Sequence, residues 1–492
     1  MRLVIMHLVV ICFYCCQRAA LPTGEGPNVI IFLVDDLGWN DNSVGFADSL
    51  SANNRFYHTP NLMKLAAQGI KFTQAYSASP VCSPTRASIL TGKNPARSGI
   101  TNWIPGEESP RPGQTRYNLP VWNEQGLTSA DTTLPGLLRA RGYLTAHVGK
   151  AHFADRGTTG ENPLNLGFDI NVAGSFIGHP ASFYYPYGDS THSHHVTGLE
   201  EYAKDKPYLD DALTRKAVTI MREAVTARRP FFLHLAHYAV HTPIQADSSR
   251  LGRYSDAERS AANKDYATMV ESMDASLGEV MKTLEDLGIA ENTLLIFLSD
   301  NGGLATHAGP PTDNLPLAGG KGTCREGGTR IPFIIRWPGK IFPREETQAQ
   351  IVTDDLVPTL AGICGFAAPS GDGVDLSPLL FNGIQPAERP LVWHWPHYWG
   401  DSTLRSRHTI IQPFSSIRVG EWKYVYRYED GQRELFNLTE DPGEHYNLMD
   451  IKQTKAKELS GLLESYLRTR QAPMLRRWDN GVPLDYQIVA VP

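Results

Sequence analysis

The stretch NVIIFLVDDLG, residues 28–38, decides the fold. Its unbroken apolar run before the two aspartates is typical of a strand that is buried on both faces of a parallel sheet. Residues 230–236 (PFFLHLA) and 293–299 (TLLIFLS) have the same character. Residues 210–227 and 263–287 have the apolar spacing of amphipathic helices. This alternation predicts an α/β fold with a mostly parallel central sheet sandwiched by helices.

The pattern of the chain changes near residue 386. Short β-type runs with turns between them, followed by one helical segment, predict a small C-terminal α+β subdomain with an antiparallel sheet. We expect a catalytic domain over residues 27–385 and this subdomain over residues 386–492. The β-type runs are residues 391–395, 415–419, 423–428 and 434–437, and the helical segment is residues 455–468.

The first 21 residues are typical of a secretory signal peptide. Arg2 gives a positive start, and residues 3–16 are mostly apolar but shorter than the roughly 20 residues that span a bilayer. We therefore expect an exported protein, periplasmic or secreted. Lipid anchoring through Cys15 or Cys16 is the alternative, and the cleavage site stays open.

Three cysteines remain once that segment is removed: Cys82, Cys324 and Cys364. An odd number in an exported protein suggests that one of them has a special role. The sequence does not decide whether Cys324 and Cys364 pair.

The composition excludes some classes of function. The 492 residues are 41% hydrophobic and 20% charged, which is ordinary for a folded protein. Lys plus Arg is 46 and Asp plus Glu is 52, so the net charge is −6 and no basic footprint for nucleic acid is present.

Several polar residues follow the predicted strands directly. Ligands bind at the carboxyl ends of the strands in open parallel sheets, so we expect these residues to meet in one cleft. Their carboxylate and amide oxygens suit Ca²⁺ or Mg²⁺ better than zinc, and the nearby lysines and histidines suit a tetrahedral oxyanion. The residues are Asp35, Asp36, Lys150, His152, His241, Asp300 and Asn301.

The segment CSPTRASILTG, residues 82–92, is the most specific motif in the chain. Cys-x-Pro-x-Arg followed by Ala-Ser-x-Leu-Thr-Gly resembles the signature of the formylglycine-dependent sulfatases, arylsulfatase-type members of the alkaline-phosphatase-like superfamily. The resemblance implies that Cys82 is oxidised after synthesis to formylglycine (3-oxoalanine). It also implies a partner that performs the oxidation, a formylglycine-generating or anaerobic sulfatase-maturating enzyme.

The resemblance extends along nearly the whole mature chain. Residues 149–152 (GKAH) are similar to the family's Gly-Lys-Trp-His, with Ala151 in place of the tryptophan. The other matching segments are residues 28–38, 241–243, 300–302, 320–332 and 434–448.

The resemblance implies a role for each site residue. In the family, a hydrated aldehyde attacks sulfur, a metal and lysines stabilise the sulfate, and a histidine, here His241, protonates the leaving alcohol. The implied ligands of one Ca²⁺ per chain are Asp35, Asp36, Cys82, Asp300 and Asn301. The implied catalytic residues are Cys82, Arg86, Lys150, His152, His241 and Lys321.

These inferences predict an exported sulfatase that hydrolyses a sulfate ester on a sugar of a polysaccharide, a glycosaminoglycan or an algal galactan. One alternative is a phosphodiesterase or phosphonate hydrolase of the same superfamily. Another is a non-catalytic protein that binds sulfated glycans, if Cys82 stays unoxidised. The sugar, the sulfate position, exo or endo action and the oligomeric state stay open.

Two further groups of residues have two interpretations each. Five histidines either contact sugar or are exposed loop residues, and the aromatic run 183–187 is either a sugar platform or loop packing. The histidines are His179, His192, His194, His195 and His307.

Overall fold

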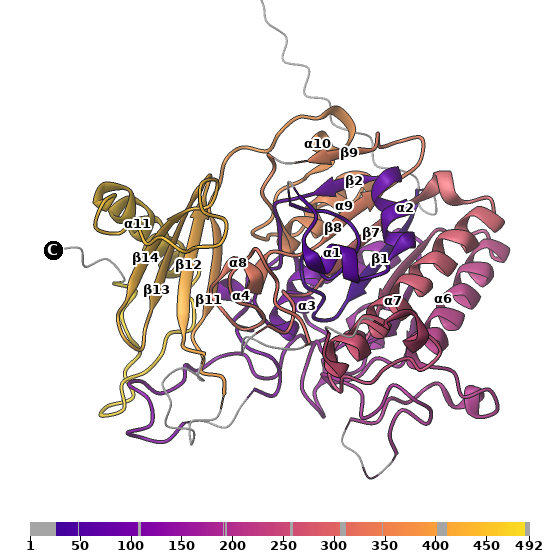
Figure 1. The fold of residues 1–492 in the computed structure, drawn as a ribbon, viewed down its shortest axis with the longest axis horizontal. Helices are drawn as coiled ribbons and strands as arrows, with labels where there is room; N and C mark the ends of the chain where they lie inside the picture. The colour runs from indigo at the N-terminus through magenta and orange to yellow at the C-terminus, as the bar shows by residue number, and fades with distance from the viewer. Residues whose placement is uncertain are drawn as a thin grey trace, which may run out of the picture.

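The computed structural model describes residues 26–487, apart from 48, 107–109, 190, 192–193, 256–258, 306–310, 347 and 401–410 (Figure 1). The predicted signal peptide and residues His192 and His307 lie outside the described residues. Among the described residues, no helix combines the length and the apolar character needed to cross a bilayer.

An eight-stranded sheet forms the centre of the molecule, in the order β5-β4-β6-β1-β7-β8-β2-β9. Neighbouring strands are parallel except that β8 is antiparallel to β7 and β2. The predicted mostly parallel sheet is confirmed. Its strands are β1 (Asn28–Val34), β2 (Ile70–Phe72), β4 (Leu144–Gly149), β5 (Ile170–Val172), β6 (Phe231–Ala236), β7 (Thr293–Ser299), β8 (Phe333–Arg336) and β9 (Arg344–Glu346).

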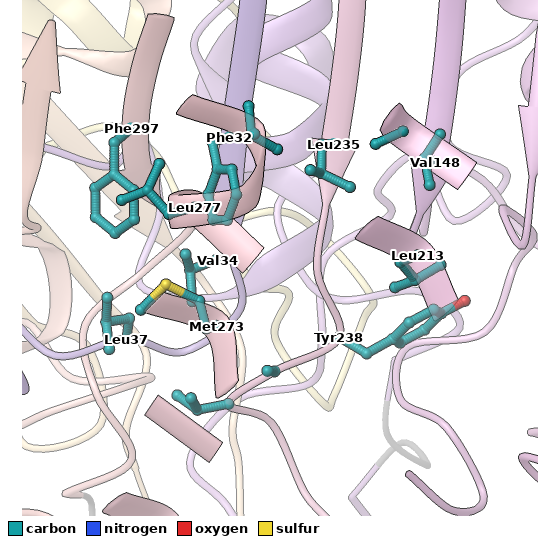
Figure 2. Close-up of a cluster of buried hydrophobic side chains, with 14 of the residues drawn as sticks. Phe32, Val34, Leu37, Val148, Leu213, Leu235, Tyr238, Met273, Leu277 and Phe297 are labelled. Carbon is teal, nitrogen blue, oxygen red and sulfur yellow. The ribbon is translucent and has the colours of Figure 1, made fainter. Parts of the chain in front are cut away.

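Helices cover both faces of this sheet. Successive residues of β1 point to opposite faces, so alternate residues of this strand pack with different helices. Ile30, Phe32 and Val34 belong to a cluster with residues of α2, α6 and α7, and Figure 2 shows Phe32 and Val34 beside Met273 and Leu277 of α7. The alternate residues of β1 pack against α3, α5, α9 and α10. The helices are α1 (Ala52–Phe56), α2 (Pro60–Gln68), α3 (Cys82–Thr91), α4 (Pro95–Ser98), α5 (Leu134–Ala140), α6 (Leu209–Thr226), α7 (Ala261–Asp286), α8 (Glu326–Thr329), α9 (Leu356–Cys364), α10 (Ser377–Asn382) and α11 (Gln453–Thr469).

A separate antiparallel sheet follows, in the order β11-β12-β13-β14 (Figure 1). Helix α11 packs on one face of it through Leu459 and Leu463, whereas Trp393 and Trp395 on the other face pack against Tyr76 and its neighbours. This confirms the predicted small antiparallel sheet, and the proposed boundary at residue 386 falls between α10 and β11. The strands are β11 (Leu391–Trp395), β12 (Phe414–Val419), β13 (Trp422–Arg427) and β14 (Arg433–Asn437), and a two-stranded sheet joins β3 (Ala75–Tyr76) to β10 (Ile351–Val352).

Candidate active site

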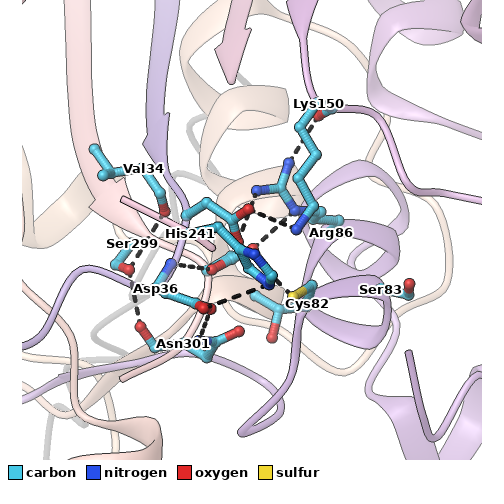
Figure 3. Close-up of polar contacts among 12 residues, drawn as sticks. Val34, Asp36, Cys82, Ser83, Arg86, Lys150, His241, Ser299 and Asn301 are labelled. Carbon is cyan, nitrogen blue, oxygen red and sulfur yellow. Dashed lines mark hydrogen bonds and ion pairs between the residues drawn. The ribbon is translucent and has the colours of Figure 1, made fainter. Parts of the chain in front are cut away.

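The polar residues that follow the strands meet at the carboxyl edge of the sheet, as predicted. Strand β1 lies between β6 and β7, and β4 lies on the far side of β6, so all four strands deliver their following residues to one edge (Figure 3). These residues are Asp35 and Asp36 after β1, Lys150 and His152 after β4, His241 in the segment beyond β6, and Asp300 and Asn301 after β7.

Helix α3 brings Cys82 to the same edge. The helix begins at Cys82 itself, and Pro84 is tolerated in its first turn. The N-cap residue Val81 makes no side-chain cap, so the positive end of the helix dipole lies beside the thiol. The Cys82 Sγ lies 3.8 Å from Asp35 Oδ1.

Three carboxylates in the site are each paired with a cation. All six side chains are at least nine-tenths buried, and buried charges of this kind need partners. The pairs are Lys150 Nζ with Asp35 Oδ2 at 2.6 Å, Lys321 Nζ with Asp36 Oδ2 at 2.7 Å, and Arg86 Nε with Asp300 Oδ2 at 2.8 Å. We call this set, together with Asn301, the catalytic-edge cluster.

The carboxyl groups of the cluster differ in their pKa. Burial raises the pKa of Asp35 well above its usual value, although Lys150 opposes the shift. Burial acts the same way on Asp36, but Lys321 and His241 outweigh it and hold the pKa of Asp36 below its usual value. Arg86 similarly outweighs burial and lowers the pKa of Asp300. Asp36 and Asp300 are therefore ionised at neutral pH.

The carboxylate and amide oxygens at this edge fit a hard divalent cation. Asp300, whose two oxygens accept from Arg86 Nε and the Asp36 N–H, lies outside the group of ligand atoms that come together. Ligand atoms of Asp35, Asp36, Cys82 and His241 all lie within 4.8 Å of one another. The amide nitrogen of Asn301 donates to Asp36 Oδ1 at 2.8 Å, whereas its buried Oδ1 has no hydrogen-bond partner. A buried acceptor without a partner costs about 1–3 kcal/mol, which a bound cation would remove. Carboxylate and amide oxygens are the ligands that Ca²⁺ prefers.

His152 is held as a neutral imidazole with a defined tautomer. Its Nε2 lies 2.6 Å from the carbonyl oxygen of Ile104, which only accepts, so Nε2 carries the proton. Burial, reinforced by Lys150, lowers the pKa of His152 well below its usual value. Its Nδ1 is therefore a proton acceptor, and that buried atom has no hydrogen-bond partner.

His241 lies between the carboxylates and the open side of the site. Its Nε2 is 3.5 Å from Asp36 Oδ2, and its Nδ1 contacts Thr242. The segment that carries it is tied to β1, because Val240 donates its N–H to the carbonyl oxygen of Asp35 at 2.7 Å. The His241 side chain is 14% exposed, so it reaches both a buried carboxylate and an incoming molecule.

A cavity of about 300 Å³ opens over these groups. Trp103 and Trp399 form one part of its wall, with ring centroids 5.0 Å apart. His179 forms another part and stacks between His194, at 3.9 Å, and His241, at 5.7 Å. The lining residues are Cys82, Trp103, Ile104, Pro105, His152, Phe176, Ile177, Gly178, His179, His194, His241, Lys321 and Trp399.

The structure answers three questions that the sequence left open, on the loop histidines, the aromatic run and the two remaining cysteines. His179 and His194 line the cavity, and His195 is not among its lining residues. The aromatic run 183–187 is loop packing, since Phe183 and Tyr187 are buried in the core. Cys324 and Cys364 are both unpaired.

Sequence reasoning did not identify Trp103 or Trp399 as lining residues. Trp103 lies in a long segment without periodic spacing, and Trp399 follows β11 in the C-terminal subdomain. Only the contact between the two parts of the chain brings both tryptophans to the cavity.

Comparison with known proteins identifies the family. The family model of sulfatases matches residues 27–366, and that of the N-sulphoglucosamine sulphohydrolase C-terminal region matches residues 321–472. A sulfatase of Formosa agariphila is 30% identical over 96% of this chain and 94% of its own length. Human arylsulfatase A is 30% identical over 88% of this chain and 85% of its own. N-acetylgalactosamine-6-sulfatase of Canis lupus familiaris is 33% identical over 77% and 70%.

Two solved structures share the fold of this chain. The structure of Ps i-CgsB in complex with k-i-k-neocarrahexaose is 27% identical, with a TM-score of 0.73 over 90% of this chain and 93% of that one. A phosphonate monoester hydrolase of Agrobacterium radiobacter shares the fold at 20% identity and a TM-score of 0.61 over 92% of this chain and all of that one. The chain thus belongs to the sulfatase family of the alkaline-phosphatase-like superfamily and is a sulfuric ester hydrolase.

Proposed function

We propose that the protein hydrolyses sulfate esters on sugars through a formylglycine at position 82 and a bound Ca²⁺. The observation that carries this proposal is the placement of Cys82 at the first turn of α3, facing Asp35 and lining the same cavity as Lys321 and His241. An aldehyde hydrate at that position would supply one hydroxyl to attack sulfur. Loss of the proton from its second hydroxyl would re-form the aldehyde, break the bond to the sulfated oxygen and release sulfate. Asp35, Asp36, Asp300 and Asn301 would hold a divalent cation, which would supply positive charge for the sulfate oxygens.

The cations of the chain bind and orient the sulfate group. Lys321 lines the cavity, and its pKa is raised because Asp36 outweighs the effect of burial, so it stays charged. When a divalent cation pairs with the Asp36 carboxylate, the Lys321 ammonium can turn from Asp36 to a sulfate oxygen. Arg86 joins Asp300 to the carbonyl oxygen of Lys150, at 2.8 and 2.7 Å, and so fixes the first turns of α3 against the sheet.

The two histidines have different roles in moving protons. His241 lies beside the open cavity and is the group that we assign to protonate the leaving alcohol. His152 lines the same cavity, and its buried Nδ1 has no hydrogen-bond partner, which suits this residue to receive a hydroxyl proton.

The cavity wall favours a sugar as the leaving group. Trp103 and Trp399 present aromatic surface on which the apolar face of a pyranose ring packs, and His179 and His194 present polar ring edges. The similarity to N-acetylgalactosamine-6-sulfatase and to Ps i-CgsB with its bound oligosaccharide supports a sulfated glycosaminoglycan or algal galactan as substrate.

Two further proposals follow from the sequence. Residues 1–21 direct export of the protein, to the periplasm or outside the cell or as a lipid-anchored form. Cys82 requires a formylglycine-generating or anaerobic sulfatase-maturating enzyme as a partner during synthesis.

Parallel assays on an aryl sulfate and an aryl phosphate, with metal analysis of the purified protein, test the proposal. We expect the sulfate to be the better substrate and one calcium ion to be bound per chain. A preference for the phosphate ester together with two tightly bound zinc ions would overturn the proposal and favour a phosphatase-like enzyme.

A further inference from the structure

A second group of buried charges joins the C-terminal sheet to helix α8. Lys423 on β13 places its Nζ 2.9 Å from Glu326 Oε1 and 3.0 Å from Glu444 Oε1. The three side chains are fully buried. We call Glu326, Lys423 and Glu444 the clamp.

The clamp fixes both the side chain and the backbone of Glu326. Glu444 Oε2 accepts the backbone N–H of Glu326 at 2.6 Å, which satisfies a free donor at the start of α8. The Tyr76 hydroxyl donates to Glu326 Oε2 at 2.6 Å, and the Arg418 guanidinium lies 3.8 Å from the same oxygen. The first turn of α8 is therefore held from the C-terminal sheet and from β3.

Helix α8 in turn supports the loops that carry the sulfate-binding side of the site. Gly302, next to Asn301, donates its N–H to Gly328 O at 3.0 Å. A Cβ at Gly302 would lie 1.8 Å from Gly327 O, so the two backbones are in direct contact. Lys321 donates its N–H to Gly303 O at 3.0 Å, and Gly327 bonds to Ala318 O at 2.8 Å, which closes the loop around Lys321.

We infer that Lys423 and Glu444 are positioning residues for Lys321. This inference rests on the proposed role of Lys321 in binding sulfate. The clamp fixes α8, α8 fixes the loop of residues 318–328, and this loop sets where the Lys321 ammonium lies. The C-terminal sheet thereby determines how tightly the enzyme binds the sulfate group, although neither residue lines the cavity.

The test compares Lys423→Met with the wild type in steady-state kinetics, with inorganic sulfate as a competitive probe. We expect the inhibition constant of sulfate and the KM of an aryl sulfate to rise together by roughly 5- to 50-fold, with a smaller change in kcat. Lys423→Arg, which keeps the charge, should recover most of the affinity. Glu444→Gln, which keeps an acceptor for the Glu326 N–H, is the milder variant if Lys423→Met does not fold.

A double-mutant cycle separates positioning from a purely structural role. Lys321→Ala alone should weaken sulfate binding, and Lys423→Met should add little in the Lys321→Ala background, because both changes act through the same ammonium. Arg389→Met is the control. It removes a partly buried ion pair with Asp355, at the start of α9, and should leave sulfate affinity unchanged.

The cycle also distinguishes failure of the inference from failure of the proposed function. If Lys321→Ala leaves sulfate affinity unchanged, the proposed role of Lys321 is wrong. If Lys321→Ala weakens binding but Lys423→Met and Glu444→Gln do not, or if the two effects simply add, the positioning role is wrong.

Discussion

The catalytic-edge cluster and the clamp are both groups of buried charges, but they differ in what borders them. The clamp lies between a β-sheet and a helix, and each of its three side chains has an opposite charge within hydrogen-bond distance. The catalytic-edge cluster instead lies under a cavity that Lys321 lines, and the buried Asn301 Oδ1 in it has no hydrogen-bond partner. Buried charge alone therefore does not identify an active site. Access to a cavity distinguishes the cluster that we propose to bind substrate from the clamp, none of whose residues lines that cavity.

The largest expected effect is loss of bound metal, which should follow a change in the catalytic-edge cluster but not a change in the clamp. Asp300→Ala removes a proposed metal ligand and the partner of Arg86. We expect it to lose bound calcium and about 10³-fold or more of kcat/KM, since a metal contributes several kcal/mol to stabilising the transition state. Lys423→Met should keep its calcium. Metal analysis and kinetics on both variants check this contrast, and an Asp300→Ala protein with full calcium content would refute the ligand assignment.

The next effect tests the proton donor within the catalytic edge. His241→Ala should slow hydrolysis of an alkyl sugar sulfate by about 10²–10⁴-fold. An aryl sulfate should be affected far less, because its phenol leaving group needs less protonation. Equal losses on the two substrates would exclude His241 as the acid and make His152 the better candidate.

A third prediction compares how calcium changes the unfolding free energy of one variant from each group. Removing one partner of a buried ion pair costs about 3–5 kcal/mol of unfolding free energy, so both Lys321→Ala and Lys423→Met should be destabilised without metal. Added calcium should restore much of the stability of Lys321→Ala, because it takes over the charge of Asp36, but not that of Lys423→Met. Denaturant unfolding with and without calcium measures this, and equal recovery of both variants contradicts the comparison.

The smallest effect concerns Asp354, a buried carboxyl whose hydrogen bonds come from Ser88 and Asn94. Burial raises its pKa to about 7. Between about pH 4 and pH 7 the folded protein keeps a proton that the unfolded chain has released, so the unfolding free energy falls as pH rises and levels off above pH 7.

Asp354→Asn should remove this part of the pH dependence. The stability of the variant relative to the wild type should then rise by about 1–3 kcal/mol from pH 5 to pH 8. Unfolding curves of both proteins at the two pH values check the sign. A constant difference would show that Asp354 titrates normally.

The sequence predicted most of the fold and which side chains meet at one edge of the sheet, for identifiable reasons. Asp35, Asp36 and Asp300 each follow a continuous apolar strand, and Cys82 lies in a specific motif. Such local patterns are enough to predict where these residues meet, because the carboxyl ends of parallel strands lie at one edge of the sheet.

The contacts between the two sheets were beyond sequence reasoning. Lys423 and Glu326 are 97 residues apart, and Glu444 and Glu326 are 118 apart, in segments with no pattern that pairs them. Trp103 and Trp399 come together at the cavity in the same way. Side chains that meet only when two parts of the chain pack leave no periodic signal in either part.

The most direct test of the account is to measure the modification at position 82 and the turnover in the same preparations. The protein should be made with and without a formylglycine-generating enzyme, and the peptide that contains Cys82 analysed by mass spectrometry. We expect sulfatase turnover to rise in proportion to the fraction of aldehyde at position 82, with calcium content unchanged. Cys82→Ser should fold and at best become sulfated once, because serine has no second hydroxyl to expel the sulfate. Full turnover by protein whose Cys82 is wholly an unmodified thiol, or by Cys82→Ser, would contradict the proposed mechanism.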